Sequence, residues 1–513
     1  MRKLFALYVN EMTKLLHRVS MLVVMIVMIV CVIGYSLLSY FSYSFYDTVF
    51  TSNSMEEELA YWKGEKSTLE YKLEAAMAST STDAAASISS IQDDIDNTEI
   101  EIKVLSLFIE NGINRYTSKD FRAKAIEQIS EYSYNLISLR RQAKLSPEAQ
   151  DEVDKYEGYI QKLENIIKSK DYKSYIEFSK SAIYGDTSLS DTEREINNEY
   201  YDLLYLNDPN GTGEIDGLED ALAAIKNERL SLYTGLNRID YSKFGMPLSI
   251  QDEEYITNKL AVDRYNVENG YLSLYDESAR SYDAASAVNK CLSLGTIFIA
   301  IVIMIIAGTT VSQEIGTGSI KSLIIAPVKR WKIMTAKLLS VITVIVTDML
   351  LLYIISLGIS TVLYGKSIQA PYVYAVQGVV SEIPFMLYEL ISAGLLAVKV
   401  TVYAVFALLL STLTRNSAVS VGLSIGTYFG LSTISSILTL SFSGEWLKFI
   451  PFNHLELQSR VFEFSPIYSS SYSGMLTETS GTTSLLFSAI YIAVLTVTMI
   501  ITIYDSFNNR DIK

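Results

Sequence analysis

Hydrophobic residues along the chain gather in six long runs that polar segments separate. The first run covers residues 19–45 and contains no charged side chain. An apolar run of roughly 25 residues can cross the ~30 Å hydrocarbon core of a bilayer as a tilted helix. The other five runs are residues 291–311, 333–363, 384–413, 418–440 and 484–504. The pattern therefore predicts six transmembrane helices.

Residues 46–290 show a different pattern, in which apolar positions repeat at steps of three and four. Such spacing places apolar side chains on one face of a helix. One series runs from Leu59 to Leu73 and another from Ile88 to Ile109, with a polar turn at Ser79–Asp83 between them. They predict an antiparallel helical hairpin with coiled-coil seams. The predicted fold class is an all-α membrane protein with a helical, coiled-coil-rich domain inserted between the first two spans.

Two further segments flank the predicted spans. Residues 1–18 mix apolar and basic side chains, which predicts an amphipathic helix on an anionic membrane surface. Residues 441–483 are too polar to cross the bilayer, but the apolar stretch Trp446–Phe452 suits a re-entrant or interfacial segment in the outer leaflet.

Composition and charge support this layout and orient it. The chain has 513 residues, of which 49% are hydrophobic and 19% charged, so a water-soluble protein is excluded. Residues 46–290 carry 46 acidic and 26 basic residues, whereas the rest carries 11 and 16. Because basic loops stay inside, we expect both termini in the cytoplasm, the protein crossing the membrane several times, and residues 46–290 outside. The acidic excess there suits cationic partners or a solvated surface.

The residue types that usually carry catalysis form no pattern in this chain. The phosphate-binding motif G-x-x-x-x-G-K-[ST] is absent, and His17 and His454 fall on opposite sides of the predicted membrane. Cys31 and Cys291 lie in or beside apolar runs, so we expect free buried thiols and no disulfide framework in the inserted domain. We expect neither an enzyme, nor a cofactor in this chain, nor a nucleic-acid partner.

The stretch Gln313–Lys337 is a polar and basic interruption between the second and third spans. Gly316 and Gly318 come first, a short apolar patch and Pro327 follow, and basic residues around Arg330 close it. This order suits a short amphipathic helix along the headgroups before the chain re-enters the bilayer. An ordinary cytoplasmic loop is the alternative, and charge alone leaves both open.

Four features of the chain occur together. They are Glu11, Lys14 and Arg18 before the first span, the large insert after it, the six-span layout, and the pattern Glu314-x-Gly316-Thr317 with Pro327, Arg330 and Lys337. In this combination the chain resembles an ABC transporter permease of the ABC-2 type. The resemblance covers residues 1–46 and 290–513, and the insert departs from the short external loop of that family.

The resemblance implies a function and partners. The stretch after span two would be a coupling helix that docks on a separate ATPase subunit, which binds ATP and Mg²⁺. A second permease, identical or homologous, would face this one across a two-fold axis in the lipid bilayer. The chain would couple ATP hydrolysis to export of a peptide or a lipid-like substrate. The candidate coupling residues are Glu314, Gly316, Gly318, Pro327 and Arg330.

Two other classes of function stay open. A non-transporting scaffold or receptor, of the phage-receptor or secretion-accessory type, also places a coiled-coil ectodomain after its first span. A calcium-regulated sensor would bind its ligand without moving a substrate. Co-purification of an ATPase distinguishes the transporter from both.

Small residues form a stripe in the fifth predicted span. Gly422, Gly426 and Gly430 recur every four residues, which lets another helix approach closely. That helix belongs either to a second permease copy or to the same subunit.

Two charged residues lie within predicted spans. Asp348 and Lys399 stand near the middle of the third and fourth spans, where charge is costly and usually paired. We expect an ion pair between them, as a structural lock or as part of a substrate path.

One stretch of the inserted domain matches the calcium loop of an EF-hand. Gly213 stands at the position of the sharp turn, although Asp220 follows where an apolar residue is usual. A plain Pro-Asn-Gly turn is the alternative. The candidate calcium ligands are Asp208, Asn210, Thr212, Glu214, Asp216 and Glu219.

Overall fold

The protein folds almost entirely into helices, which form two compact units. Unit 1 comprises Met1–Tyr40 and Ser231–Lys513, and unit 2 comprises Phe41–Leu230. The computed structural model describes residues 2–17, 19–49, 52–78, 84–116, 118–143, 148–186, 188–213, 215, 217–239, 244–272, 275, 284–319, 328–364, 371–441, 445–464 and 485–509.

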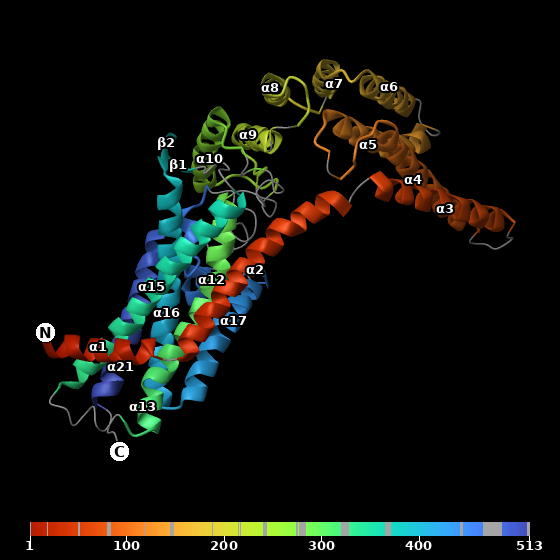
Figure 1. The fold of residues 1–513 in the computed structure, drawn as a ribbon. Coiled ribbons are helices and arrows are strands. Elements are labelled where there is room, and N and C mark those ends of the chain that lie inside the picture. Colours follow the sequence, from red (N-terminus) through yellow and green to blue (C-terminus); the bar gives the residue numbers. More distant parts are fainter. Residues whose placement is uncertain are drawn as a thin grey trace. The chain divides into compact units, whose positions relative to one another are not determined.

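Unit 1 contains the long apolar helices. Its helices are α1 (Arg2–Leu16), the first part of α2 (Val19–Val49), α10 (Ile250–Asn269), α12 (Ala284–Thr310), α13 (Ser312–Gly316), α15 (Arg330–Tyr364), α16 (Phe385–Thr414), α17 (Ser417–Ser441), α18 (Leu457–Val461) and α21 (Leu485–Asn509). In Figure 1, α1 and α13 lie at one end of this unit, and α10 lies at the other.

Four stretches among the described residues are long and apolar enough to cross a membrane. They are Ala287–Gly316, Arg330–Leu363, Phe385–Thr414 and Leu485–Asn509. They coincide with the second, third, fourth and sixth predicted spans. The first and fifth predicted spans fold as helices α2 and α17, and their crossing of the membrane stays a prediction.

Helix α12 packs against α15, α16 and α17, so it lies at the centre of the unit 1 core. Two glycines of α12 allow α15 and α17 to approach it closely. A Cβ atom on Gly295 would lie 2.4 Å from Leu352 Cδ1 of α15, and one on Gly308 would lie 2.9 Å from Val421 Cγ2 of α17. Small residues therefore bring these helices close together, as is common in membrane bundles. Both cysteines are free, and Cys291 Sγ lies 3.0 Å from Ser36 Oγ of α2.

A β-hairpin between α15 and α16 departs from the all-α prediction. Strands β1 (Tyr372–Val376) and β2 (Val379–Ile383) pair antiparallel, with Val376 opposite Val379. The turn residues Gln377 and Gly378 have φ angles of 51° and 78°, which the tight hairpin turn requires. The signal in the sequence was a β-branched and aromatic run followed by Gln-Gly.

Helix α10 packs on this hairpin, so it belongs to unit 1, and the inserted domain of residues 46–290 stays a prediction about the side of the membrane. The amide of Gly378 donates to Asn258 Oδ1 of α10 over 2.8 Å, and buried Val262 shares a core with Tyr372 and Phe462. The predicted domain ended at Lys290, whereas the compact unit ends at Leu230.

The predicted re-entrant segment begins with short helical turns. These are η2 (Glu445–Phe449), η3 (Pro451–His454) and α18, which contact α16, α17 and α21. His454 is buried, with Nδ1 3.0 Å from Ser488 Oγ and Nε2 2.6 Å from the Lys448 carbonyl oxygen. This part of the segment therefore packs on helices of unit 1; residues 465–484 lie outside the described part.

Unit 2 consists of helices joined by short connections. They are the end of α2, α3 (Ser52–Met77), α4 (Ala84–Glu110), α5 (Phe121–Ala143), α6 (Glu148–Ser169), α7 (Tyr172–Tyr184), α8 (Asp191–Asn207) and most of α9 (Leu218–Thr234). Helix α3 packs on α4, α4 on α5, and α5 on α6, so the predicted helical hairpin is present. Its turn at 79–83 lies outside the described residues, and coiled-coil seams stay a prediction.

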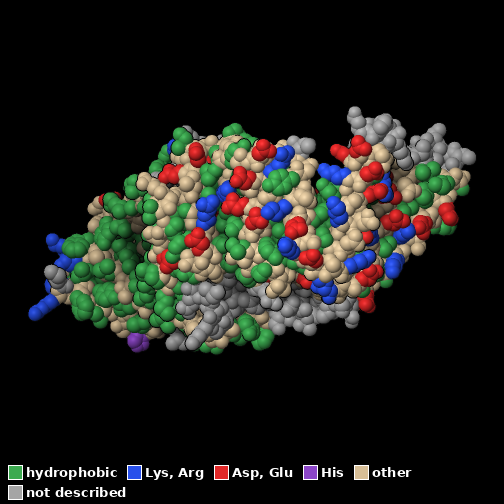
Figure 2. Space-filling model, turned by 90° about the horizontal axis from the view of Figure 1, so that it is seen from above, with side chains coloured by type: hydrophobic (Ala, Val, Ile, Leu, Met, Phe, Trp, Pro, Cys, Tyr) green, Lys and Arg blue, Asp and Glu red, His purple; other side chains and the backbone are tan. Residues whose placement is uncertain are grey.

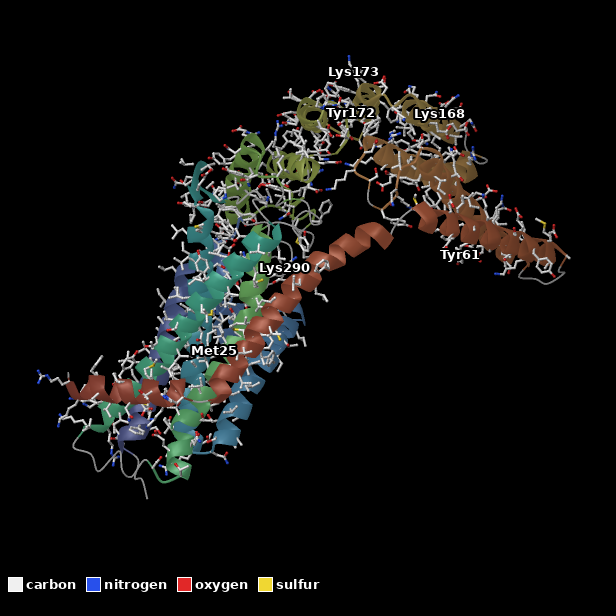
Figure 3. The ribbon with its side chains drawn as sticks, in the orientation of Figure 1. Met25, Tyr61, Lys168, Tyr172, Lys173 and Lys290 are labelled. Carbon is white, nitrogen blue, oxygen red and sulfur yellow. The ribbon has the colours of Figure 1, made fainter. Side chains whose placement is uncertain are left out.

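Aromatic side chains fill much of the unit 2 core. Tyr172 begins α7 shortly after Lys168 in the last turn of α6 (Figure 3), and its ring centroid lies 5.0 Å from that of Phe121 on α5. Phe108 and Ile126 are fully buried in the same cluster. The Asp171 side chain caps α7 by accepting from the Ser174 amide over 3.2 Å, which fixes where this helix begins.

Candidate functional site

Four charged side chains form a closed ring at the end of unit 1 where α1, α13 and α15 meet. Lys14 Nζ lies 2.9 Å from Glu11 Oε1 and 3.2 Å from Glu314 Oε1. Lys337 Nζ lies 3.0 Å from Glu11 Oε2 and 2.9 Å from Glu314 Oε2. Each carboxylate thus contacts both ammonium groups, and the four charges sum to zero. We call this group the charge ring.

The charge ring is largely closed to solvent. The Lys337 side chain is 0% exposed and that of Glu11 is 7% exposed, whereas Lys14 is 43% exposed. Burial alone would raise the pKa of Glu11, but the charges and hydrogen bonds of Lys337 and Lys14 bring it below its usual value. A buried charge is tolerated when it is paired and bonded, so the four residues depend on one another.

The sequence of α1 places three of its polar residues on the side that faces the protein. Tyr8, Glu11 and Lys14 are three residues apart and therefore share a face. The Tyr8 hydroxyl donates to Thr343 Oγ1 of α15 over 3.0 Å, and Leu15 is buried beside this face. Phe5 is 67% exposed, which leaves an apolar side chain for the predicted contact with the membrane.

Serine side chains hold the break between α12 and α13. The amides of Val311 and Ser312 donate to Ser411 Oγ of α16 over 3.3 and 3.0 Å. Ser312 Oγ lies 2.9 Å from Ser417 Oγ at the start of α17. Glu314 is therefore positioned by contacts with two other helices. Neither Ser411 nor Ser417 stood out in the sequence, because single serines in apolar runs are common.

The structure places most of the candidate coupling residues near the charge ring. Glu314 belongs to the ring itself, and Gly316 ends α13 with open space around it. Gly318 has a φ of 72°, a conformation that favours glycine. Arg330 starts α15, and its Nη1 donates to the Asn508 carbonyl oxygen of α21 over 3.1 Å. Pro327 and the expected surface helix fall in residues 320–327, outside the described residues.

The expected ion pair between Asp348 and Lys399 is not present among the described contacts. Lys399 of α16 is bonded instead to Glu456, just before α18, while Asp348 is buried within α15. A further buried acid, Glu389 of α16, accepts from Asn289 Nδ2 over 3.1 Å. Neither Glu389 nor Glu456 was predicted from the sequence, although a single glutamate within an apolar run was the available signal for Glu389.

The pair Lys399–Glu456 gives a charge-swap prediction. Each single variant, Lys399→Glu or Glu456→Lys, is expected to lower the melting temperature, because two like charges then face each other. The double variant is expected to recover most of that loss, since Glu456 is exposed enough to adapt. Each single variant is expected to lose about 1 kcal/mol of the free energy of unfolding. Thermal unfolding of the detergent-solubilised chain measures it, and recovery by Asp348→Lys with Lys399→Asp instead would contradict the assignment.

The glycine stripe of α17 faces open space among the described residues. A Cβ atom on Gly422, Gly426 or Gly430 would meet no heavy atom within 4 Å. Among the residues that the structure describes, no helix of the same subunit therefore packs closely against these glycines. The alternative, a contact between two permease copies, stays a prediction.

Two of the six candidate calcium ligands have other partners in the structure. Asp208 accepts from the Gly213 amide through Oδ2 over 2.8 Å, and Glu219 is bonded to Lys124 and accepts from the Tyr200 hydroxyl. Glu214 and Asp216 lie outside the described residues. No group of three or more His, Cys, Asp or Glu side chains suits a metal ion within the described part of the chain. Calcium binding stays a prediction that requires Glu219 to leave Lys124.

An apolar cavity of about 740 Å³ opens between α15, α16 and α21. Small residues hollow it out, among them Gly394, Ala397 and Ala493, and Met349 and Leu350 line the side of α15. These helices are candidate membrane spans, so the cavity lies within the predicted hydrocarbon region. It suits an apolar chain rather than a polar ligand.

Known proteins similar to this chain identify its family. The model of a family described as "ABC-2 family transporter protein" matches residues 5–512. The chain is 34% identical over 149 residues to "Uncharacterized membrane protein YdbK" of Bacillus subtilis (strain 168), over 29% of this chain and 56% of that protein. It is 30% identical over 173 residues to "Uncharacterized protein YhcI" of the same organism, over 32% of this chain and 53% of that protein.

The matches to the two Bacillus subtilis proteins cover only part of each protein. The chain spans about half the length of the curated relatives that it matches. No solved structure matches it. The family model, in contrast, covers nearly every residue, including both ends of the segment that carries Glu314 and Lys337. The chain therefore belongs to the ABC-2 family of transporter proteins.

Proposed function

We propose that the chain is the membrane-spanning permease subunit of an ATP-driven exporter. A separate ATPase subunit binds ATP with Mg²⁺ and hydrolyses it, and this chain is not itself an enzyme. A second permease, identical or homologous, completes the transporter in a bacterial cytoplasmic membrane, with both termini of the chain in the cytoplasm. The substrate class is a peptide or a lipid-like molecule, and the apolar cavity between α15, α16 and α21 suits its apolar part.

The charge ring is the observation that carries this proposal. The segment 313–337 has Glu314 at one end and Lys337 at the other, and both belong to the same ring. Glu11 adds α1, and Thr310 at the end of α12 offers its carbonyl oxygen to Lys337 at 3.5 Å. A force on the segment would therefore move α1, α12 and α15 together. Such rigid-body motion is how closure of nucleotide-binding subunits can reach membrane helices.

Site-specific photo-crosslinking tests the proposed docking surface. A photoreactive amino acid at Lys329 or Trp331 is expected to capture an ATPase subunit, because both side chains are exposed and lie within the segment. The matched control is Val362 near the other end of α15, which is 83% exposed and should capture none. The captured protein must carry a Walker motif and hydrolyse ATP in the purified complex. Purification without any ATPase from these variants would favour the non-transporting scaffold instead.

A further inference from the structure

The apolar cavity of about 740 Å³ in unit 1 has walls that come mainly from three candidate membrane spans. Helices α15, α16 and α21 contact one another around it. Met349 of α15, Ala393 of α16 and Ile492 of α21 line it, and each is at least 95% buried. A Cβ atom on Gly394 would meet no heavy atom within 4 Å, so this glycine leaves the wall open. The cavity is therefore a gap between helices that otherwise pack together.

The described residues that line the cavity offer no free side-chain donor to an occupant. Two of them are polar, and both are threonines. The Thr401 hydroxyl donates to the Ala397 carbonyl oxygen over 2.8 Å, and the Thr496 hydroxyl donates to the Ile492 carbonyl oxygen over 2.7 Å. Every other lining residue is apolar or glycine. A polar group that entered would give up its hydrogen bonds to water without replacement, so these walls select an aliphatic occupant.

The cavity opens sideways, onto the outer surface of the spans. Its lining includes Val346 of α15, Val398 of α16 and Val497 of α21, each of which is at least 42% exposed. Exposed Ile354 of α15 and Val494 of α21 extend this apolar surface along the same helices. Hydrophobic side chains gather over the left-hand part of Figure 2, where the helices of unit 1 lie. In a bilayer such a surface faces lipid tails, because the hydrocarbon core holds no water.

An alkyl chain fits this space better than a helix or water does. A helix about 10 Å wide that rises 1.5 Å per residue takes up roughly 120 Å³ per residue. The cavity of about 740 Å³ would thus hold roughly six helical residues, which is fewer than two turns. A buried water molecule needs about two to four polar partners, which these walls do not supply. An alkyl chain needs no polar partner, and it is flexible enough to enter from the side.

We infer that this cavity binds one acyl chain of a bilayer phospholipid, because phospholipids supply the alkyl chains that its opening meets in a membrane. The inference rests on the proposed function only for the placement of α15, α16 and α21 in the bilayer. It deepens that function by naming the chemistry that the cavity binds. A bound phospholipid occupies the space that suits the apolar part of a substrate, so the two compete.

Photolabelling of the full chain in nanodiscs tests this inference. The nanodiscs consist of phosphatidylcholine, part of which carries a photoreactive diazirine near the end of one acyl chain, and mass spectrometry locates the adducts. We expect adducts on Met349 and Ile492, which are buried and line the cavity. Leu352 on α15 and Ile503 on α21 are the internal controls, because they are still more buried and do not line it. Equally frequent adducts on the controls, or none on Met349 and Ile492, overturn the inference.

Matched glycine variants locate the bound chain. Gly394→Leu places a side chain in the open space at the cavity wall, and we expect labelling of Met349 to fall at least about tenfold. Gly358→Leu is the control, because an added Cβ there also meets nothing within 4 Å, but Gly358 does not line the cavity. Ala493→Leu fills the cavity from α21 and replaces Gly394→Leu if that variant does not fold. An equal loss in the control, or no loss in the cavity variants, overturns the inference.

A second probe and the ATPase capture separate the remaining alternatives. A free fatty acid with the same diazirine presents an alkyl chain without a phospholipid headgroup. Labelling of Met349 by the fatty acid alone overturns the choice of a phospholipid. Failure of the lipid labelling leaves the capture of an ATPase at Lys329 unaffected, and failure of that capture leaves acyl-chain binding unaffected. The two proposals therefore fail separately.

Discussion

Replacing Lys337 by methionine is expected to lower the free energy of unfolding by about 3–5 kcal/mol. The Lys337 side chain is fully buried, and its removal leaves the carboxylates of Glu11 and Glu314 facing each other with only half-exposed Lys14 between them. Methionine keeps most of the volume, so the loss reports the charge rather than a cavity. Thermal unfolding of the full chain in detergent measures it, and we expect the melting temperature to fall by roughly 1 °C for each kcal/mol, because the entropy of unfolding grows with chain length.

Two further variants separate this effect from a general loss of charge. Lys399→Met removes one cation from a pair whose partner Glu456 is 46% exposed, and we expect a loss of at most about 1 kcal/mol. The triple variant Lys337→Met with Glu11→Gln and Glu314→Gln should recover much of the stability, because no unpaired carboxylate remains. If Lys337→Met and Lys399→Met lower the melting temperature equally, the charge ring does not hold the helices together.

Replacing Gly213 by alanine is expected to destabilise unit 2 by about 3 kcal/mol or more. The φ angle of Gly213 is +66°, which costs a residue with a Cβ atom about 1–2 kcal/mol. The new Cβ would also lie 2.1 Å from the Lys119 carbonyl oxygen, so the backbone must shift. The cost of the positive φ angle and the cost of the contact with Lys119 add, so the loop between α8 and α9 should become more flexible.

Gly112 provides the matched control for this prediction. Its φ angle is also +66°, but a Cβ atom there would meet nothing within 4 Å. Gly112→Ala should therefore cost only the 1–2 kcal/mol of the backbone conformation. Hydrogen exchange of the Phe121 amide, which donates to the Gly211 carbonyl oxygen over 2.9 Å, reports on the loop directly. Measurement in a calcium chelator keeps the result independent of metal binding, and equal losses in the two variants would rule out the clash.

Most of the helical fold could be predicted from the sequence, because each helix carries its own pattern. An apolar run of span length must fold as a helix in a bilayer, since no water is there to bond to its backbone. The hairpin β1–β2 was missed because a short strand pair has a weaker local signal than a long helix. The division into compact units at Leu230 depends on packing, since α10 looks like the other helices and only its contact with β1 assigns it to unit 1.

Which charged side chains pair with each other was harder to predict than which charged residues are candidates. Asp348 and Lys399 were rightly singled out as charges in apolar runs, but they were paired with each other because Glu456 lies in a separate short segment. Glu11, Lys14, Glu314 and Lys337 were all part of the pattern that resembles the family, yet the sequence did not indicate that the four side chains meet. Pairing depends on how helices distant in sequence pack, and periodicity carries no information about that.

Apolar length and charge are local properties, so the amino-acid sequence is enough to predict a helical membrane protein with a basic segment at 313–337. It also supplied Glu314 and Arg330 as candidates on that segment. The tertiary structure decided that Glu314 and Lys337 close a ring with Glu11 and Lys14. The physical reason is burial: a charge withdrawn from water must find its counter-charge wherever the packed helices place one.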